Sequence, residues 1–352
     1  MIPIGNVLPE VAELRALLVA NHRGDGRQRW RALLTSAMCP SQDTSDEAAT
    51  ALQTMAFCEE LGHGLALEPY LEVSVLAAGL LRGISATAFT ERLARISRGA
   101  EKLVFAWWEP DMPTRFDAAA MTALPCRAGW RLDGRKAVVI AADDADTLLV
   151  TARIDGEAPA LFLLDAHTAG ITRINYPTID GRMASDLIFE SVQVETEGLV
   201  ADAKAARPLL ARIGDVAIAA LCAEGIGVMR YMLDATIAYT SDRRQFGQPI
   251  ATFQTLQHRM VDMFLKIEMA AAATLAATAS LVGTAADRAI AVSAAKVMVA
   301  DACRFVGQNC IQLHGGLGMD SATPVTRYFC RALAIESEFG SAAFHLERVA
   351  AA

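Results

Sequence analysis

The sequence has no surplus of positive charge and no paired cysteine motif. It carries 32 Lys and Arg against 40 Asp and Glu, a formal net charge of −8. It therefore lacks the basic face that non-specific binding of nucleic acid requires. Its seven Cys include no Cys-x-x-Cys pair and mostly lie in apolar segments, so we expect reduced core thiols rather than disulfides or metal ligands. No cluster with metal-ligand spacing is visible.

The sequence also shows no signal peptide and no uninterrupted apolar run long enough to span a bilayer. No motif recurs with a period of 20–50 residues, which argues against a solenoid. With 352 residues, 53% of them hydrophobic, the chain is long enough for two or three packed domains. We therefore expect a globular protein of the cytoplasm that is not bound to a membrane.

Apolar periodicity divides the chain into three regions. Residues 1–100 and 203–352 carry apolar residues at spacings of three and four, which is typical of helices. Residues 101–200 instead contain short β-branched or aromatic runs, several of them separated by Asp-Gly turns such as Asp133-Gly134. This pattern predicts an α+β protein with an N-terminal helical domain, a middle β-barrel and a C-terminal four-helix bundle. The expected helices are 11–19, 47–61, 73–82, 89–98, 207–242, 252–282, 285–310, 324–336 and 341–348, and the expected strands are 102–106, 129–132, 136–141, 147–154, 160–165, 172–176 and 187–194.

A basic corner lies between two of the expected helices. The stretch from Tyr239 to Met263 reads as a helix end, a turn and a helix start, with Arg243-Arg244-Gln245-Phe246-Gly247 at the turn. The planar fork of Arg donates several hydrogen bonds, so Arg at this corner could bind an anion such as a phosphate. Taken alone, the stretch is more often a plain helical hairpin with solvated charges.

A glycine-rich segment, Gln312-Leu313-His314-Gly315-Gly316-Leu317-Gly318, follows the third helix of the last region. Glycines without a Cβ let backbone N–H groups come close to a ligand, and a pyrophosphate accepts such donors. Taken alone, this segment is more often an ordinary turn between helices. Its place downstream of the basic corner makes the binding interpretation the stronger one.

The order of these two motifs resembles that of the acyl-CoA dehydrogenase family, over most of the chain from about Glu59 onward. Before Asp46 the match is poor, so the N-terminal helical domain is expected to be shortened. The resemblance implies that FAD is the cofactor and that both motifs hold its ADP half across a dimer interface, with Arg243 on the pyrophosphate and Phe246 near the adenosine. The residues it assigns to the ADP half are Arg243, Phe246, Gln254, Gln312, Leu313 and Gly316.

The β region departs from the family where the flavin ring should lie. Family members carry Thr-Glu-Pro and then a small turn, whereas residues 107–114 read Trp-Trp-Glu-Pro-Asp-Met-Pro-Thr. Trp108 replaces the hydroxyl, and Met112 and Pro113 replace the small residues. The later flavin-contacting strand reads Val-Val-Ile-Ala at 138–141. Indole rings at such a position fill a slot rather than line it, so we expect this chain's own flavin slot to be degenerate.

The catalytic base of the family is also missing from its usual place. Alignment on Gly340 puts Phe339 at the position of the base, and one residue along a helix turns the adjacent Glu338 by about 100°. The family's alternative base position reads Ala217. Glu224 lies two turns further on, among apolar residues that make a carboxylate a stronger base. It is the best base candidate, although a buried carboxylate bonded to a partner group is the more common situation.

Several other polar residues are expected to have structural roles. Arg244 has the properties of a solvated cation at a helix end, favoured by the helix dipole. His258 and His314 belong to no triad with a nucleophile and are expected at helix ends or seams. His345 is expected at the surface.

A chain that keeps the ADP-binding motifs but lacks the flavin slot and the base resembles the smaller subunits of heteromeric acyl-CoA dehydrogenases. Examples are the pimeloyl-CoA dehydrogenase small subunit and the actinobacterial enzymes that oxidise steroid side-chain CoA esters. The resemblance implies an α2β2 heterotetramer in which a large subunit oxidises an acyl-CoA to the 2-enoyl-CoA and passes electrons to an electron-transfer flavoprotein. Two alternatives stay open: a homomeric dehydrogenase that uses Glu224 as base, and a non-catalytic scaffold or acyl-CoA-binding protein.

Overall fold

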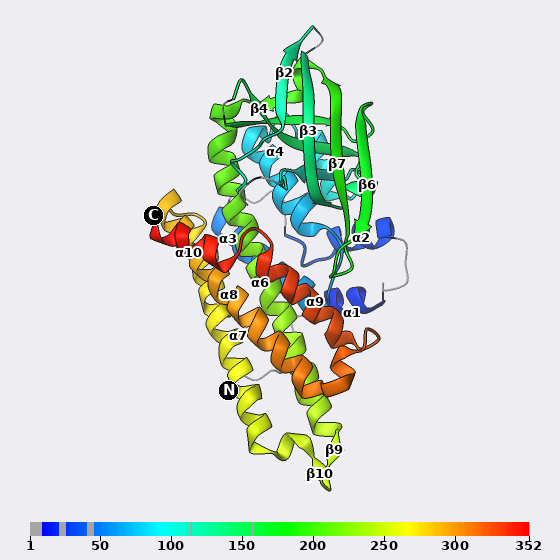
Figure 1. The fold of residues 1–352 in the computed structure, drawn as a ribbon, viewed down its shortest axis with the longest axis vertical. Helices are drawn as coiled ribbons and strands as arrows, with labels where there is room; N and C mark the ends of the chain where they lie inside the picture. Colours follow the sequence, from blue (N-terminus) through cyan, green and yellow to red (C-terminus); the bar gives the residue numbers. More distant parts are fainter. Residues whose placement is uncertain are drawn as a thin grey trace. The chain divides into compact units, whose positions relative to one another are not determined.

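A computed structural model describes residues 9–20, 26–40, 46–110, 112, 115–127, 129–156 and 158–351 of the chain (Figure 1). Its contacts divide the protein into two compact units. One unit contains the described residues of Met1–Asp25, Thr35–Ala66 and Ile218–Ala352, and the other contains Gly26–Leu34 together with the described residues of Leu67–Ala217. The predicted division at residues 100 and 203 follows other boundaries and stays a prediction.

The second unit is built on an eight-stranded mixed sheet. The strands pair in the order β6-β7-β3-β2-β4-β5-β8, and β1 lies beside β4. β1 and β2 run parallel to β4, and the remaining pairs are antiparallel. The strands are β1 (Leu103–Ala106), β2 (Thr122–Cys126), β3 (Gly129–Ile140), β4 (Thr147–Ile154), β5 (Pro159–Asp165), β6 (Ile171–Pro177), β7 (Met183–Val194) and β8 (Leu199–Ala201).

Helices complete the second unit and bury its apolar residues. Trp30 of α2, Leu81 of α4 and Phe162 of β5 are buried and belong to its core. The predicted helix at 73–82 is present, but it begins as a π-helix. The helices are α2 (Gly26–Leu34), the π-helix Leu71–Ala77, α4 (Ala78–Ser85), α5 (Thr90–Ser97) and the first part of α6 (Ala203–Asp242).

The first unit is mainly helical in its described residues. Each of its predicted helices is confirmed to within a few residues, because their apolar faces repeat at helical spacing over several turns. Side chains cap three of them: Asp46 at α3, Thr284 at α8 and Ser341 at α10 accept backbone N–H groups. The helices are α1 (Pro9–Ala20), α3 (Glu47–His63), α6 from Ile218 on, α7 (Gln254–Ser280), α8 (Ala285–His314), α9 (Pro324–Ser337) and α10 (Ala342–Ala350).

Two glycines let α3 and α6 cross closely. A Cβ added to Gly62 would overlap the backbone carbonyl of Glu224, and one added to Gly227 would overlap the carbonyl of Glu59. The backbones therefore touch where no side chain fits between them. This crossing fixes where the segment of α6 that carries Glu224 lies against α3.

One helix of the described part of the chain, α6, is long and apolar enough to cross a membrane by length and composition alone. Its most apolar window has a mean hydropathy of 1.6, and 78% of that window is buried within the protein. This differs from the expectation that no run was long enough, and the burial is that of a core helix.

All seven cysteines are thiols, as predicted, and four of them are buried: Cys58, Cys222, Cys303 and Cys310.

Candidate functional site

The basic corner forms a short β-hairpin between α6 and α7, at the bottom of Figure 1. β9 (Arg244–Gln245) pairs with β10 (Gln248–Pro249), and Phe246 and Gly247 between them both have positive φ. That backbone twist is what a two-residue hairpin turn requires, and it explains the glycine. The turn leaves the Phe246 side chain 90% exposed, with its ring edge-on to Phe253 at 6.0 Å. An aromatic ring held this far out of the core is available for stacking.

The glycine-rich segment follows the end of α8. Gly315 terminates the helix with φ 61°, and its N–H group caps the carbonyls of Ile311 and Gln312. A Cβ added to Gly315 or Gly316 would meet nothing within 4 Å, so the backbone here is open to approach. The ring of His314 is buried and stacks on Tyr239 of α6 at 4.6 Å. This stack brings the two sequence motifs together, one helical turn before the corner.

The six residues assigned to the ADP half of FAD differ in exposure. Arg243, Phe246, Gln254, Gln312 and Gly316 are exposed, whereas Leu313 is buried. A contact from Leu313 would therefore come from its backbone. Together the exposed members offer a guanidinium, an aromatic ring and unhindered backbone, which are the groups that bind a diphosphate and an adenine.

Aromatic residues at the predicted flavin slot of the second unit pack within the chain. The ring of Trp107 stacks on Phe116 at 4.1 Å, and Phe116 also lies parallel to Phe105 at 6.3 Å. The backbone carbonyl of Trp108 accepts a hydrogen bond from the N–H of Ala137. Pro113, which was expected to contribute to the slot, lies outside the described residues. These contacts use the rings for packing against one another.

Glu109, the acid that remains from the family's Thr-Glu-Pro, is buried and fully engaged. Its carboxylate accepts backbone N–H groups of Ala120 and Met121 and an ion pair from Lys136 Nζ at 2.6 Å. Lys136 also donates to the hydroxyl of Thr151 at 2.8 Å, and burial lowers the pKa of Lys136 to about 8. The network anchors β3 and is structural in kind.

The strand expected to touch a flavin carries a strained residue. The register of β3 against β7 shifts between Lys136 and Val139, and Val138 between them adopts φ 50°. A β-branched residue is rarely found in this left-handed region. The N–H of Val138 donates to Asp186 Oδ1 at 3.1 Å, which holds the bulge in place.

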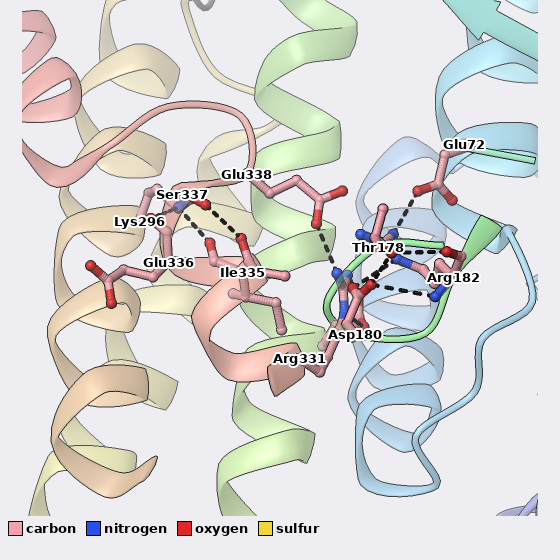
Figure 2. Close-up of polar contacts among 12 residues, drawn as sticks. Glu72, Thr178, Asp180, Arg182, Lys296, Arg331, Ile335, Glu336, Ser337 and Glu338 are labelled. Carbon is pink, nitrogen blue, oxygen red and sulfur yellow. Dashed lines mark hydrogen bonds and ion pairs between the residues drawn. The ribbon is translucent and has the colours of Figure 1, made fainter. Parts of the chain in front are cut away.

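Both carboxylates near the family's base position bind one buried arginine. Arg331 of α9 donates from Nε and Nη2 to the two oxygens of Glu224, at 2.5 and 2.7 Å. Its Nη1 donates to Glu338 at 2.8 Å, as Figure 2 shows. Only 2% of Arg331 is exposed. The residues around Glu224 are thus not only apolar, and the sequence did not reveal that Glu224 and Glu338 share a partner.

Phe339, which the alignment on Gly340 puts at the predicted position of the family's base, lies in the connection from α9 to α10. α9 ends at Ser337, Glu338 is extended, and Phe339 has φ 58° with its ring buried. Because the helix has already ended, the predicted 100° helical rotation between Glu338 and Phe339 is wrong. The extended backbone at Glu338 directs its carboxylate to Arg331.

Two buried side chains hold the backbone of this connection. Lys296 of α8 donates from Nζ to the carbonyls of Ile335 and Glu336, at 2.8 and 3.0 Å (Figure 2). His345 of α10 hydrogen-bonds the carbonyl of Phe339 through Nε2 at 3.0 Å. His345 is fully buried, so its predicted place at the surface is wrong. α10 turns His345 inward, whereas Glu347, two residues along, is exposed.

Another buried network belongs to the second unit and was not predicted. Arg182 donates to Glu72 of the π-helix and to Asp180, both at 2.9 Å (Figure 2). Thr178 donates to the other oxygen of Asp180. The sequence signal is the Asp180-Gly181 pair, another of the Asp-Gly turns predicted between the strands; the turn is present, and the N–H of Gly181 donates to the carbonyl of Thr178. Across the described residues, no group of His, Cys, Asp and Glu is arranged to hold a metal ion.

Comparison with known proteins identifies the fold and its family. The model of the acyl-CoA dehydrogenase C-terminal domain matches residues 216–352. Acyl-CoA dehydrogenase FadE27 of Mycobacterium tuberculosis is 28% identical over 333 residues, which cover 92% of this chain and 87% of the relative. Residues 216–352 thus match the acyl-CoA dehydrogenase family, and the chain as a whole is similar to an acyl-CoA dehydrogenase.

Two solved structures extend this assignment over the whole acyl-CoA dehydrogenase fold. One is the ChsE4-ChsE5 complex from Mycobacterium tuberculosis, with a TM-score of 0.82, 25% identity, and coverage of 98% of this chain and 97% of that chain. Another is a variant of the Tcur3481-Tcur3483 steroid ACAD, with a TM-score of 0.78, 29% identity and coverage of 97% of each chain. The predicted α+β acyl-CoA dehydrogenase class is confirmed.

FAD is the cofactor of acyl-CoA dehydrogenases, and the two parts of this chain fit it differently. The exposed groups at the corner and the open backbone at Gly316 suit the ADP half. The stacked Trp107, the engaged Glu109 and the strained Val138 do not suit the flavin ring.

Proposed function

We propose that this chain is the non-oxidising subunit of a heteromeric, FAD-dependent acyl-CoA dehydrogenase of the cytoplasm. A larger subunit of the same family would bind the acyl-CoA, supply the base and oxidise the thioester to the 2-enoyl-CoA. FAD supplies the chemistry of accepting the two electrons, which would then pass to an electron-transfer flavoprotein. This chain would hold the ADP half of that FAD from outside. The predicted division into a shortened helical domain, a β-barrel and a helical bundle is part of this proposal.

One observation carries the proposal: Glu224 and Glu338 are both bound to Arg331, while Phe339 stands at the predicted position of the base. A phenyl ring cannot accept a proton. Glu224 and Glu338 share one buried guanidinium, and a Glu224 carboxylate that took up a proton would lose a charge-assisted hydrogen bond of its bidentate pair with Arg331. Glu224 is therefore poorly suited to act as a base, which argues against the homomeric alternative.

The corner between α6 and α7 supports a role in holding FAD. Arg243 and Phe246 point to solvent at the hairpin, and the open backbone of Gly316 follows α8, whose end is joined to α6 by the stack of His314 on Tyr239. Charge-assisted hydrogen bonds from Arg to a diphosphate are among the stronger ones in proteins. These groups would bind the ADP half of an FAD that another chain brings into contact with them.

The solved relatives support a heteromeric assembly. The printed names of two of them, the ChsE4-ChsE5 complex and the Tcur3481-Tcur3483 steroid ACAD, each join two different chains. By analogy with these, we propose an α2β2 partnership with a larger acyl-CoA dehydrogenase subunit. The steroid ACAD makes a bulky acyl-CoA a reasonable substrate class for the assembly.

Production of the chain alone and together with a flavin-carrying acyl-CoA dehydrogenase subunit tests this function. Alone, the chain should bind no FAD and oxidise no acyl-CoA, whereas the complex should be yellow and active. The Arg243→Ala variant should weaken retention of FAD by the complex about 10-fold or more, the value of one hydrogen bond to a charged group. Arg244→Ala is the matched control, because it removes the same charge one residue away.

Two results would replace the proposal by its alternatives. A chain that is yellow and active alone, and loses activity on Glu224→Gln, would be a homomeric dehydrogenase. A chain for which no flavin-carrying subunit restores FAD would be a scaffold or an acyl-CoA-binding protein.

A further inference from the structure

His314, the last residue of α8, has one ring nitrogen that is bonded within the chain and one that is not. Its Nδ1 lies 2.8 Å from the backbone carbonyl oxygen of Cys310. A carbonyl oxygen only accepts, so Nδ1 carries the ring proton, and Nε2 of the neutral imidazole is left with a lone pair. Among the residues that the structure describes, none donates a hydrogen bond to Nε2. His314 therefore offers an unused acceptor.

The fold holds this ring in place. Only 6% of His314 is exposed, and its ring stacks on Tyr239 with the centroids 4.6 Å apart and the planes at 19°. A flip of the ring would break the bond to Cys310, so Nε2 keeps its position. Buried polar atoms of native proteins nearly always have a hydrogen-bond partner. A ligand that brings a donor would supply the partner that Nε2 lacks.

His314 lies within the site assigned to the ADP half of FAD. Gly315 and Gly316 follow it directly, and a Cβ added to either would meet nothing within 4 Å. Tyr239, on which the ring stacks, lies in the last turn of α6, just before the corner that carries Arg243. The buried acceptor thus belongs to both motifs of the site.

The other groups of this site suit the diphosphate, and the Nε2 lone pair does not. Arg243 only donates, and the backbone N–H groups of the glycine-rich segment do the same. Phosphate oxygens only accept, so a lone pair that faced them would be repelled. The donors of the ADP half are the ribose hydroxyl groups and the 6-amino group of adenine. Nε2 is complementary to one of these.

The 6-amino group is the better match for an acceptor of fixed tautomer. A hydroxyl group both donates and accepts, so it finds a partner in either tautomer of a histidine. The amino group of adenine only donates, and it requires an acceptor. A 6-oxopurine presents an acceptor at the same position and would meet the Nε2 lone pair unfavourably. An acceptor locked by Cys310 therefore distinguishes the two kinds of base.

We propose that Nε2 of His314 accepts a hydrogen bond from the 6-amino group of adenine and makes the site select FAD over a flavin dinucleotide that carries a 6-oxopurine. His314 is then a residue that determines specificity, in addition to the groups that bind the diphosphate. This inference rests on the proposed function, because it needs the ADP half of FAD at the corner between α6 and α7.

Equilibrium dialysis of the flavin-free complex of this chain with a flavin-carrying subunit tests the inference. The complex should bind FAD at least about 10-fold more tightly than the analogue in which hypoxanthine replaces adenine, because the analogue sets two acceptors against each other. His314→Phe keeps an aromatic ring beside Tyr239 and removes Nε2. It should weaken the binding of FAD, leave that of the analogue nearly unchanged and so abolish the preference.

The matched control is His258→Phe, because His258 is an exposed histidine of α7 outside the assigned residues. It should keep the native preference. A His314→Phe complex that loses affinity for both dinucleotides equally would show a merely structural role and overturn the inference. The same conclusion would follow if His314→Phe abolished a preference for FAD over its 2′-deoxyadenosine analogue, because Nε2 would then bind the ribose.

The same measurement separates this inference from the proposed function. A complex that binds FAD and the hypoxanthine analogue equally well would overturn the role of His314 and leave the proposed function standing. A complex that binds neither dinucleotide would overturn the proposed function and the role of His314 with it.

Discussion

Arg331 binds both oxygens of Glu224 and, with its remaining nitrogen, one oxygen of Glu338. One guanidinium from α9 therefore joins α6 to the connection that follows α9. A buried cation between two carboxylates compensates their charge, and its loss would be costly because the carboxylates would lose their common cation in the interior. The relationship thus joins the base candidate Glu224 to Glu338, the residue next to the predicted base position.

Removal of Arg331 should destabilise the protein strongly. Arg331→Met leaves Glu224 and Glu338 without their common cation, and breaking a buried pair costs about 3–5 kcal/mol. Denaturant titration would measure the loss. The control is Arg304→Met, because Arg304 pairs with Glu336 at the surface, and such exposed pairs contribute little to stability. Similar losses in the two variants would show that the Arg331 network contributes little.

The α3–α6 crossing should tolerate no added methyl group. Gly62→Ala or Gly227→Ala would push a carbon into a backbone carbonyl of the facing helix, at a cost of about 1–3 kcal/mol or more. Thermal unfolding would report this loss. Gly316→Ala is the matched change, because open space surrounds that position and its effect should stay within about 0.5 kcal/mol. If all three variants unfold at the same temperature, α3 and α6 can separate enough to accommodate the added methyl group.

Much of the fold could be predicted from the sequence because its long helices repeat their apolar faces many times. α7 and α8 were located to within a few residues for this reason. Short elements lacked such repetition, and α2, β2 and β8 were not predicted. Asp133-Gly134 was read as a turn between two strands, yet both residues lie inside β3 at a register shift. An Asp-Gly pair favours a bulge as readily as a turn, and only pairing with β7 decides between them.

The site was less predictable, because it depends on contacts between distant segments. Order along the chain indicated the two ADP motifs, and the stack of Tyr239 on His314 brings them together as the resemblance implied. The partner of Glu224 lies 107 residues away on another helix. The predicted 100° rotation between Glu338 and Phe339 requires that α9 continue through Glu338, whereas α9 ends at Ser337. The signal that could have indicated the network is Arg331 itself, an arginine on the apolar side of a short helix.

The stability of the protein should fall in acid because of His345. Burial and the positive charge of Lys296 lower the pKa of His345 to about 4, while its bond to the carbonyl of Phe339 acts in the opposite direction. The unfolded chain, with a pKa near 6.5, therefore binds more protons than the folded one below that pH. The contribution is fully present above pH ~6.5 and is lost as the pH falls towards ~4, up to about 3 kcal/mol.

Free energies of unfolding measured between pH 7 and pH 4.5 would check this. His345→Gln should be less stable than the native chain at pH 7 but should lose less stability on acidification. His258→Gln, at an exposed position of α7, should keep the native slope. A native slope in His345→Gln would mean that carboxylates, not this histidine, set the acid response.

Val138 should be a site where the native residue is not the most stable one. Its φ of 50° crowds the Cβ of a β-branched residue against its own backbone, a strain of about 1–2 kcal/mol, and 45% of the residue is exposed, so little packing offsets it. Val138→Gly removes that strain and adds about 0.5–1 kcal/mol of unfolded-state entropy, so a small net rise in melting temperature is expected. Val139→Gly, one residue along and buried, should lower it. If both variants lose stability, packing of the Val138 side chain at the bulge outweighs its backbone strain. The Val138 side chain would then help to specify this strand, which faces a flavin elsewhere in the family.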